Sequence, residues 1–273
     1  MTRTTPVDAT ATTPAEALVE RVGNVMVITI NRPEARNAVN SAVSIGVGTA
    51  LEEAAEDPEV RAIVITGAGD KSFCAGADLK AITRGESVYA PGRELWGFAG
   101  FVNHFVDKPT IAAVNGTALG GGTELALAAD LIVAAENATF GLPEVKRGLL
   151  AGAGGVFRLP AQIPQRLAME MIFTGEPITA ARSVEIGLIN AVAPVGESVG
   201  AAIELAQRIA VNAPLSVQAS KRIAYGVVDG ARPDEDARWS LSAAEWAQLK
   251  TSDDAKEGPL AFSQKREPVW KAH

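Results

Sequence analysis

Apolar residues in the first part of the chain occur in short runs separated by turn-forming residues. Two of these runs, 17–21 and 25–30, flank the dipeptide Gly23-Asn24, which is typical of a tight turn. We therefore expect a β-hairpin here and take it as the start of the fold. Residues 1–15 are rich in threonine and lack the apolar middle of a secretory signal, so we expect a disordered tail.

Beyond the hairpin, helical and strand patterns alternate. Asn40 can cap a helix that ends near residue 55, before Asp57-Pro58. This alternation predicts an α/β fold with largely parallel strands. The further expected elements are buried strands at 62–66, 110–114 and 131–134, a helix near 93–105 and a helix that opens at the glycines 120–122.

The strand patterns end after about Val195. Four segments with helical periodicity follow, separated by proline and glycine: 196–211, 214–228, 233–249 and 253–265. The expected organisation is therefore the tail over 1–15, an α/β core over 16–195 and a helical C-terminal region over 196–273.

Composition narrows the possible functions. The chain has 25 Lys+Arg against 32 Asp+Glu and a net charge of −7, which argues against a nucleic-acid binder held by phosphate contacts. Its one cysteine, Cys74, cannot form an internal disulfide, and His104 and His273 are too few for a Cys/His metal site. No apolar run approaches the roughly 18 to 20 residues of a membrane span. We expect a cytoplasmic protein with no metal and no membrane partner.

The most informative segment is 108–127, KPTIAAVNGTALGGGTELAL. A buried strand runs into a triple glycine, which opens a helix with Glu124 in its first turn. The first N–H groups of a helix lack partners and carry the positive end of its dipole, and Gly121 lets a ligand atom approach them. An oxyanion could therefore bind beside Glu124. A glycine run alone is more often a flexible turn next to a surface acid.

Two further segments add to this picture. Residues 72–80, SFCAGADLK, could supply a second backbone donor from Ala77, and residues 140–155 place Glu144 after a proline in a glycine-rich stretch. Each alone fits an ordinary loop. Together with Gly121 and Glu124 they offer two donors for a carbonyl oxygen and two carboxylates for proton transfer beside it.

These segments, in this order, resemble the crotonase superfamily and specifically its enoyl-CoA hydratases. The similarity runs from about Val19 to Trp270. Its blocks include NRPEARNA at 31–38, AGADLK at 75–80, ALGGGTELA at 118–126 and FGLPE at 140–144; AENATFGLPE and GGVFRLP are closer to the crotonobetainyl-CoA hydratase branch. The resemblance implies a spiral of repeated strand-strand-helix units and C-terminal helices that pack between subunits in trimers, often paired as hexamers.

The resemblance also assigns the site. It implies that the N–H groups of Ala77 and Gly121 bind the thioester oxygen and that Glu124 and Glu144 are the catalytic acids. Glu124 would activate water and Glu144 would exchange the proton at Cα, with the division between them open. Family members with other chemistry often change one acid, so the presence of both favours reversible hydration to a 3-hydroxyacyl-CoA.

Coenzyme A, which here is part of the substrate and not a bound cofactor, needs local positive charge on an acidic protein. The resemblance implies contacts from basic side chains and from backbone near the adenine. The candidates are Arg36, Lys80 and Lys265, with Ala35, Ala75, Asp78 and Leu79; each cation taken singly fits a solvated surface equally well. Thr123 and Ala151 depart from many hydratases, which have cysteine and proline there, and could reshape the acyl pocket, as could the segment 81–100.

Two rival functions are open. One is double-bond isomerisation or another crotonase reaction at the same carbonyl. The other, of a different class, is a noncatalytic CoA- or RNA-binding protein on this fold, against which the acidic balance and the two intact acids weigh. Dinucleotide redox chemistry does not fit, because no G-x-G-x-x-G follows a strand. The acyl group is also open: a fatty enoyl chain, a crotonobetaine-like polar acyl and a degraded sterol side chain all fit.

Overall fold

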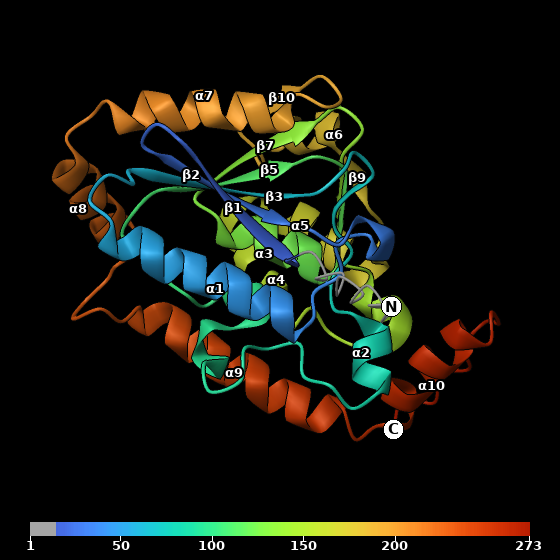
Figure 1. Ribbon diagram of the computed structural model, residues 1–273. Helices are drawn as coiled ribbons and strands as arrows, with labels where there is room; N and C mark the ends of the chain where they lie inside the picture. Colours follow the sequence, from blue (N-terminus) through green and yellow to red (C-terminus); the bar gives the residue numbers. More distant parts are fainter. Residues whose placement is uncertain (1–14) are drawn as a thin grey trace, which may run out of the picture.

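A computed structural model describes residues 15–273 of the chain, with two β-sheets at the centre and helices around them (Figure 1). Apart from Ala15, the tail predicted over 1–15 lies outside the described residues. Within 15–273, no helix combines the length and the apolar composition that crossing a bilayer requires.

The larger sheet has six strands in the order β1-β2-β3-β5-β7-β10. The first two form the predicted antiparallel hairpin around Gly23-Asn24, and every later neighbour pairs in parallel. Buried parallel strands carry unbroken apolar runs because helices cover both faces, which explains the runs at 62–66 and 110–114. The strands are β1 (Ala17–Val22), β2 (Val25–Ile30), β3 (Ala62–Gly67), β5 (Thr110–Val114), β7 (Leu131–Ala135) and β10 (Ala191–Ala193).

The smaller sheet holds four short strands in the order β4-β6-β8-β9, of which the first three are parallel. The chain passes repeatedly from the larger sheet to the smaller one and then into a helix, so that β3, β5 and β7 are followed by β4, β6 and β8. The predicted α/β spiral of strand-strand-helix units is confirmed. These elements are β4 (Ser72–Cys74), β6 (Thr117–Leu119), β8 (Thr139–Gly141), β9 (Ile178–Thr179), α2 (Leu79–Thr83), α3 (Gly121–Ala128) and α4 (Gly155–Gln162).

One face of the larger sheet is covered by α7 (Ser198–Ala210), which crosses it at the top of Figure 1. Its buried Ala202 and Ala206 pack with strand residues such as Val64 and Val133 in one apolar cluster. This face of α7 therefore completes the core of its own chain, which the expectation of subunit contacts after about Val195 did not include.

The opposite face of the sheet packs against α1 (Ser41–Glu56) through residues that include Val47 and Leu51. The Val43 N–H donates a 3.0 Å hydrogen bond to Asn40 Oδ1, which confirms the predicted N-cap.

The helix predicted near 93–105 is wrong. Only two short 3-10 turns occur there, η2 (Glu94–Trp96) and η3 (Phe98–Gly100). Gly97 and Gly100 have φ of 74° and 64°, outside the right-handed helical region. A Cβ at Gly100 would lie 2.1 Å from the Ser44 carbonyl oxygen, so the close approach to α1 requires this glycine.

The remaining elements connect or flank these layers. In Figure 1, α9 runs below α1, and α10 lies beyond the sheets at the C-terminal end. The elements are η1 (Pro33–Ala35), η4 (Pro143–Arg147), α5 (Gln165–Thr174), α6 (Ala180–Glu185), α8 (Pro214–Ala224), α9 (Pro233–Leu249) and α10 (Asp253–Ser263).

Candidate active site

Three neighbouring parallel strands bring the candidate residues to one edge of the smaller sheet. The strands β4, β6 and β8 lie side by side, and the carboxyl ends of parallel strands point the same way. The chain reaches Ala77 shortly after β4, Gly121 two residues after β6 and Glu144 three residues after β8. The three separate motifs of the sequence therefore meet in space.

The Ala77 N–H is turned away from its neighbouring strand segment. On either side of it, the Val39 N–H donates to the Gly76 carbonyl and the Asp78 N–H donates to the Val39 carbonyl, both at 2.8 Å. Successive N–H groups of an extended segment point to opposite sides, so the Ala77 N–H faces the other way. Within residues 15–273 it donates to no backbone carbonyl.

The Gly121 N–H is the second candidate donor. Gly121 is the first residue of α3, where N–H groups have no intrahelical partner. A Cβ at Gly76 would lie 3.3 Å from Gly121 N, so the segments that carry the two donors touch. A Cβ at Gly121 would lie 2.7 Å from the Phe98 ring. Glycine at 121 therefore keeps the donor accessible and leaves room for this ring.

Glu124 lies in the first turn of α3 and is only 3% exposed. Its Oε1 accepts a 2.8 Å hydrogen bond from the Gly155 N–H at the start of α4. A Cβ at Gly155 would lie 3.0 Å from the same oxygen, which is tighter than an ordinary contact, so a larger residue would displace the carboxyl group by a few tenths of an ångström. The sequence analysis missed Gly155 as a site residue; the signal was a glycine run placed directly before a helix.

Glu144 lies in η4 directly after Pro143. Its Oε1 faces Gly120, where an added Cβ would be 2.9 Å away from it. The Gly120 carbonyl also accepts a hydrogen bond from the backbone N–H of Glu124, so this glycine contacts both acids. Within the described residues, Glu144 Oε2 is buried without a hydrogen-bond partner. A buried carboxyl oxygen of this kind is expected to bond to a proton, a water or a ligand.

The two carboxyl groups perturb each other's ionisation. Burial, and after it the charge of the nearby Glu144, raise the pKa of Glu124 to about 8, although hydrogen bonds from Gly155 and Ala153 and the charge of Arg158 oppose the rise. Burial raises the pKa of Glu144 to about 7. Two close, buried carboxyls avoid ionising together, so we expect the pair to hold one proton near neutral pH.

Several predicted CoA contacts surround Ala77 at the surface. Arg36, Ala75 and Lys80 are exposed, and the Ala75 N–H donates to the Arg36 carbonyl at 3.1 Å. Ala35 precedes Arg36 at the end of η1, and Leu79 is also exposed. These residues form one surface next to the candidate donors.

Asp78 differs from its neighbours because its carboxylate is already engaged in hydrogen bonds and an ion pair within the chain. It caps α2 by accepting hydrogen bonds from the N–H groups of Lys80 and Ala81. It also forms an ion pair with Arg32, with 2.9 Å between Oδ2 and Nη2. Its backbone groups are also engaged, because its N–H donates to the Val39 carbonyl at 2.8 Å and its carbonyl accepts from the Ile82 N–H at 3.0 Å.

Lys265 lies apart from this surface along the chain, two residues after α10. It is exposed, and α10 itself packs on η4, where the Arg147 guanidinium lies 3.8 Å from the centre of the Phe262 ring. Lys265 is thus tied to the element that carries Glu144.

The two departures from the family pattern have local structural roles. The Thr123 hydroxyl oxygen lies 2.7 Å from the Ala118 carbonyl oxygen and 2.9 Å from the Gly141 carbonyl oxygen, and its proton is shared between these acceptors. The same hydroxyl accepts a hydrogen bond from the Gly141 N–H. It therefore ties β6 to β8 below the two acids. Ala151 is buried and lies next to Gly155.

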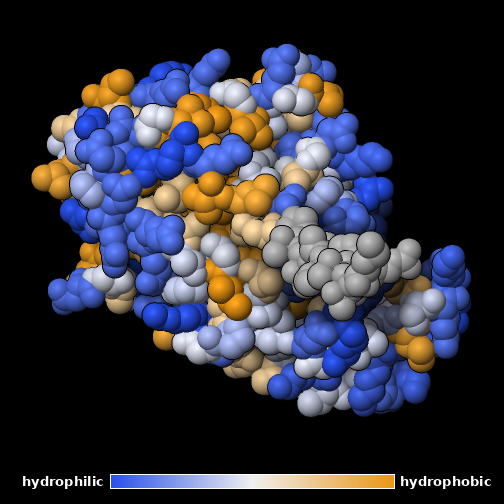
Figure 2. Space-filling view, viewed as in Figure 1, coloured by the Kyte–Doolittle hydropathy of each residue, from blue (hydrophilic) through white to orange (hydrophobic). Residues whose placement is uncertain are grey.

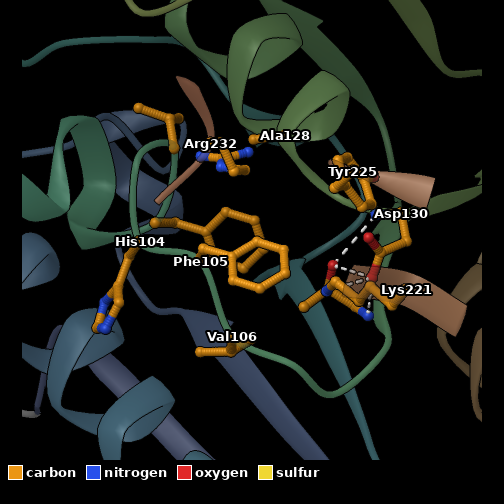
Figure 3. Close-up of a pocket in the computed structure, with 11 residues that line it drawn as sticks. His104, Phe105, Val106, Ala128, Asp130, Lys221, Tyr225 and Arg232 are labelled. Atoms are coloured by element: carbon orange, nitrogen blue, oxygen red, sulfur yellow. Dashed lines mark hydrogen bonds and ion pairs between the residues drawn. The ribbon is translucent and has the colours of Figure 1, made fainter. Parts of the chain in front are cut away.

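A small cavity of about 20 Å³ lies away from these residues, between the core and helices α8 and α9 (Figure 3). This volume suffices for about one water molecule and excludes an acyl-CoA. Within residues 15–273, no three His, Cys, Asp or Glu side chains are grouped so as to hold a metal ion.

Known proteins resemble the chain over nearly its whole length. Carnitinyl-CoA dehydratase of Salmonella paratyphi A is 44% identical over 257 residues, which cover 92% of this chain and 96% of that protein. The crystal structure of carnitinyl-CoA hydratase from Mycobacterium avium is 65% identical with a TM-score of 0.94, covering 96% of this chain and 100% of its own.

The crystal structure of enoyl-CoA hydratase from Mycobacterium tuberculosis H37Rv is 47% identical with a TM-score of 0.74, covering 95% of this chain and 100% of its own. The family described as enoyl-CoA hydratase/isomerase matches residues 20–273. As its motifs predicted, the chain belongs to this crotonase family, in the crotonobetainyl-CoA hydratase-like branch.

Proposed function

We propose that the chain is a hydro-lyase that reversibly adds water across the α,β double bond of an enoyl-CoA thioester to give a 3-hydroxyacyl-CoA. The observation that carries this proposal is the meeting of the buried Glu124 and the partly buried Glu144 with two backbone donors, Ala77 and Gly121, that bond to no backbone carbonyl within residues 15–273. This set supplies what hydration beside a carbonyl needs: proton transfer at two carbons and stabilisation of the enolate between them.

In the reaction, the oxygen of water bonds to Cβ as the water gives one proton to the ionised carboxylate. The π electrons move toward the thioester oxygen, which receives hydrogen bonds from Ala77 and Gly121, and the protonated carboxyl delivers its proton to Cα. The pair begins and ends with one proton in total. A shared proton near neutral pH is the state that this exchange requires, and the raised pKa values of Glu124 and Glu144 favour it.

For the CoA portion, we propose that the surface around Ala35, Arg36, Ala75, Leu79 and Lys80 receives the nucleotide. Guanidinium and ammonium groups pair with phosphate oxygens, and exposed backbone can contact adenine. Lys265, near the end of the chain, would add a cation from the side of η4 or from a neighbouring subunit.

For the acyl group, we propose a short polar chain of the crotonobetainyl or carnitinyl type. The names of the relatives from Salmonella paratyphi A and Mycobacterium avium support this choice. Tyr89 supports it too: it lies in the segment 81–100 expected to line the acyl pocket, it is 43% exposed, and desolvation and the charge of Glu124 raise the pKa of its phenol. An aromatic face attracts a quaternary ammonium group.

The test is a panel of enoyl-CoA substrates compared by kcat/KM, with crotonyl-CoA, crotonobetainyl-CoA and a long-chain enoyl-CoA as members. We expect loss of the conjugated thioester absorbance and the highest kcat/KM for crotonobetainyl-CoA. Glu144→Gln should bind acyl-CoA but hydrate it at least about 100-fold more slowly, because an amide cannot exchange the proton. Glu170→Gln on the exposed side of α5 is the matched control.

The same panel separates the rival functions. An isomerase would move the double bond of a 3-enoyl-CoA without consuming water. A noncatalytic binding protein would bind acyl-CoA or RNA and leave every substrate unchanged. Full turnover by Glu144→Gln would contradict the two-acid proposal whichever substrate is used.

We also propose that the protein assembles as a trimer or as a dimer of trimers, that it works in acyl-thioester (lipid and fatty acid) metabolism, and that it is cytoplasmic. A single buried free thiol, Cys74, fits a reducing compartment. For assembly, Figure 2 shows apolar side chains gathered over β1, where Leu18, Val19 and Val22 are partly exposed. Helices α8 and α9 also expose large apolar residues, which favours burial against another copy.

A further inference from the structure

A buried ion pair connects a C-terminal helix to the support of Glu124. Arg158, on α4, is 8% exposed. Its Nε donates a 2.8 Å hydrogen bond to Oε1 of Glu235 on α9, its Nη2 donates to the same oxygen, and Nη2 also donates to the Val102 carbonyl at 2.5 Å. Glu235 pairs in addition with Arg232. The guanidinium is therefore fixed in place by two different parts of the chain.

The same guanidinium lies against the start of α4. A Cβ at Gly154, the N-cap residue, would lie 3.0 Å from Nη1 and 3.3 Å from Cζ of Arg158. Within the described residues, Nη1 is buried and has no hydrogen-bond partner. Gly154 precedes Gly155, whose N–H holds the Glu124 carboxylate. Arg158 thus packs directly against the backbone that orients Glu124.

Helix α9 is itself anchored to the core, so Glu235 has a defined position. Figure 3 shows Lys221, Tyr225 and Asp130 directed toward one another, with Arg232 and Phe105 on the other side of the small cavity. Lys221 Nζ donates to Asp130 Oδ2 at 2.7 Å, and the Arg232 guanidinium lies 5.4 Å from the centre of the Phe105 ring. These contacts hold the α8–α9 connection against the core three residues before Glu235.

We propose that Arg158 and Glu235 are positioning residues for Glu124. Arg158 supports the α4 backbone that binds the carboxylate and contributes positive charge, while Glu235 orients Arg158 and balances that charge. The inference rests on the proposed catalytic role of Glu124. Under this proposal, the pKa of Glu124 on α3 depends on the docking of α9, because Glu235 on α9 orients Arg158.

The charges that face this group allow a prediction with a definite sign. Glu124 is faced by Glu144 from η4, by Arg158 from α4 and by the Tyr89 phenol. Arg158 is faced by Glu235 and Arg232 from α9. Removing the positive charge of Arg158 should raise the pKa of Glu124, and removing the negative charge of Glu235 should lower it.

The experiment compares Arg158→Met, Glu235→Gln and the double variant in the full-length protein. Glu124 has the higher pKa of the pair, so its ionisation sets the alkaline limb of the kcat–pH profile. This limb should move up by about 0.5 unit in Arg158→Met, down by about 0.5 unit in Glu235→Gln, and stay near the wild-type position in the double variant. The KM for the enoyl-CoA should change less than about twofold, because CoA contacts lie elsewhere, while kcat falls about tenfold or more in each single variant.

Matched controls are Arg238→Met and Glu245→Gln, which remove the same charges from exposed positions of α9 and should leave the limb unmoved. Arg158→Lys keeps the charge and should also keep the limb, with lower kcat. Should Arg158→Met fail to fold, Glu235→Gln and Arg158→Lys still decide the question. A lower melting temperature with an unshifted limb in Glu235→Gln would show a purely structural ion pair and overturn the proposal.

A second measurement is independent of turnover. The infrared band of the protonated Glu124 carboxyl, isolated by subtracting the spectrum of Glu124→Gln, is followed against pH in wild type and in each variant. Opposite shifts in the two single variants support the inference even if no enoyl-CoA is hydrated, whereas unshifted titrations refute it. Failure of the wild type to hydrate any substrate counts against the proposed function alone.

Discussion

The backbone N–H of Gly155 donates a 2.8 Å hydrogen bond to Oε1 of Glu124, so the start of α4 holds an acid that belongs to α3. The positive end of the α4 dipole favours the ionised carboxylate, while burial favours the neutral form. Glu124 is consequently poised between the two states that proton exchange needs.

Substitution of Gly155 by alanine tests this contact. The new Cβ would lie 3.0 Å from Cγ and Oε1 of Glu124, so the carboxylate must move although the N–H is retained. We expect kcat to fall at least about tenfold with little change in KM. Gly152→Ala in the same loop is the control, because its Cβ would meet only Leu150, at 3.3 Å from Cδ1. Equal kcat values for the two variants would contradict the positioning of Glu124 by Gly155.

The segments that carry the proposed acids and donors have local sequence signals, but their roles were assigned only by the resemblance to enoyl-CoA hydratases. Glu124 lies after a glycine run at a helix start, and Glu144 lies after a proline in a glycine-rich stretch. Their meeting could not be derived from spacing alone, since it depends on the parallel pairing of β6 with β8. Gly155 and Arg158 were missed for the same reason: their partners, Glu124 and Glu235, are far away in the sequence.

The raised pKa of Glu144 predicts how stability depends on pH. Burial makes the folded protein bind this proton more tightly than the unfolded chain does. The unfolding free energy of the wild type should therefore be unaffected below the unfolded pKa, near 4.5, and fall as pH rises toward about 7. Glu144→Gln cannot ionise, so its stability relative to wild type should increase by about 3 kcal/mol between pH 4.5 and 8.

Urea unfolding at a series of pH values measures this difference. Glu170→Gln on α5 controls for the loss of a carboxylate from the surface. A wild-type protein that gains stability relative to Glu144→Gln as pH rises would mean that Glu144 is favourably ionised in the fold, opposite to the expectation.

The proposal that the Gly121 N–H binds the thioester oxygen can be tested with two variants that introduce the same steric clash. Gly121→Ala and Gly121→Pro both place a Cβ against Phe98, 2.7 Å from its ring in the unrelaxed structure, but only proline removes the N–H. Proline is tolerated at the first position of a helix, so α3 should still form. We expect kcat/KM of Gly121→Pro to be about 100- to 1000-fold below that of Gly121→Ala. Equal activities would place the donor elsewhere.

The fold was predictable where local patterns match tertiary structure. The hairpin at β1–β2, the strands β3, β5 and β7, and the start of α3 follow apolar runs and glycines that are read directly. The helix expected near 93–105 failed because Gly97 and Gly100 serve a close approach to α1, which local periodicity does not report. Likewise, the apolar residues of α7 predicted that one face of this helix is buried. They could not predict that the face packs against the larger sheet of the same chain.

With α7 assigned to the core, the expected subunit contact narrows to α8–α10. Leu215 and Ile223 on α8 and Leu241 on α9 are 77%, 81% and 63% exposed in the single chain. Large apolar side chains at such exposure favour association, and closed symmetry would bury them in every subunit. Light scattering should give the wild type a mass of three or six times 28.3 kDa at micromolar concentration.

Ile223→Lys should shift that mass toward the monomer, because an ammonium group would have to be desolvated at the contact. Activity per chain should fall with it if Lys265 serves a neighbouring subunit, since the CoA site would then lose a cation on dissociation. Gln207→Lys, on an exposed position of α7, adds the same charge outside the expected contact and should leave the mass unchanged. A wild-type protein that is monomeric and fully active would show that the apolar residues of α8 and α9 do not join subunits and that Lys265 acts, if at all, within its own chain.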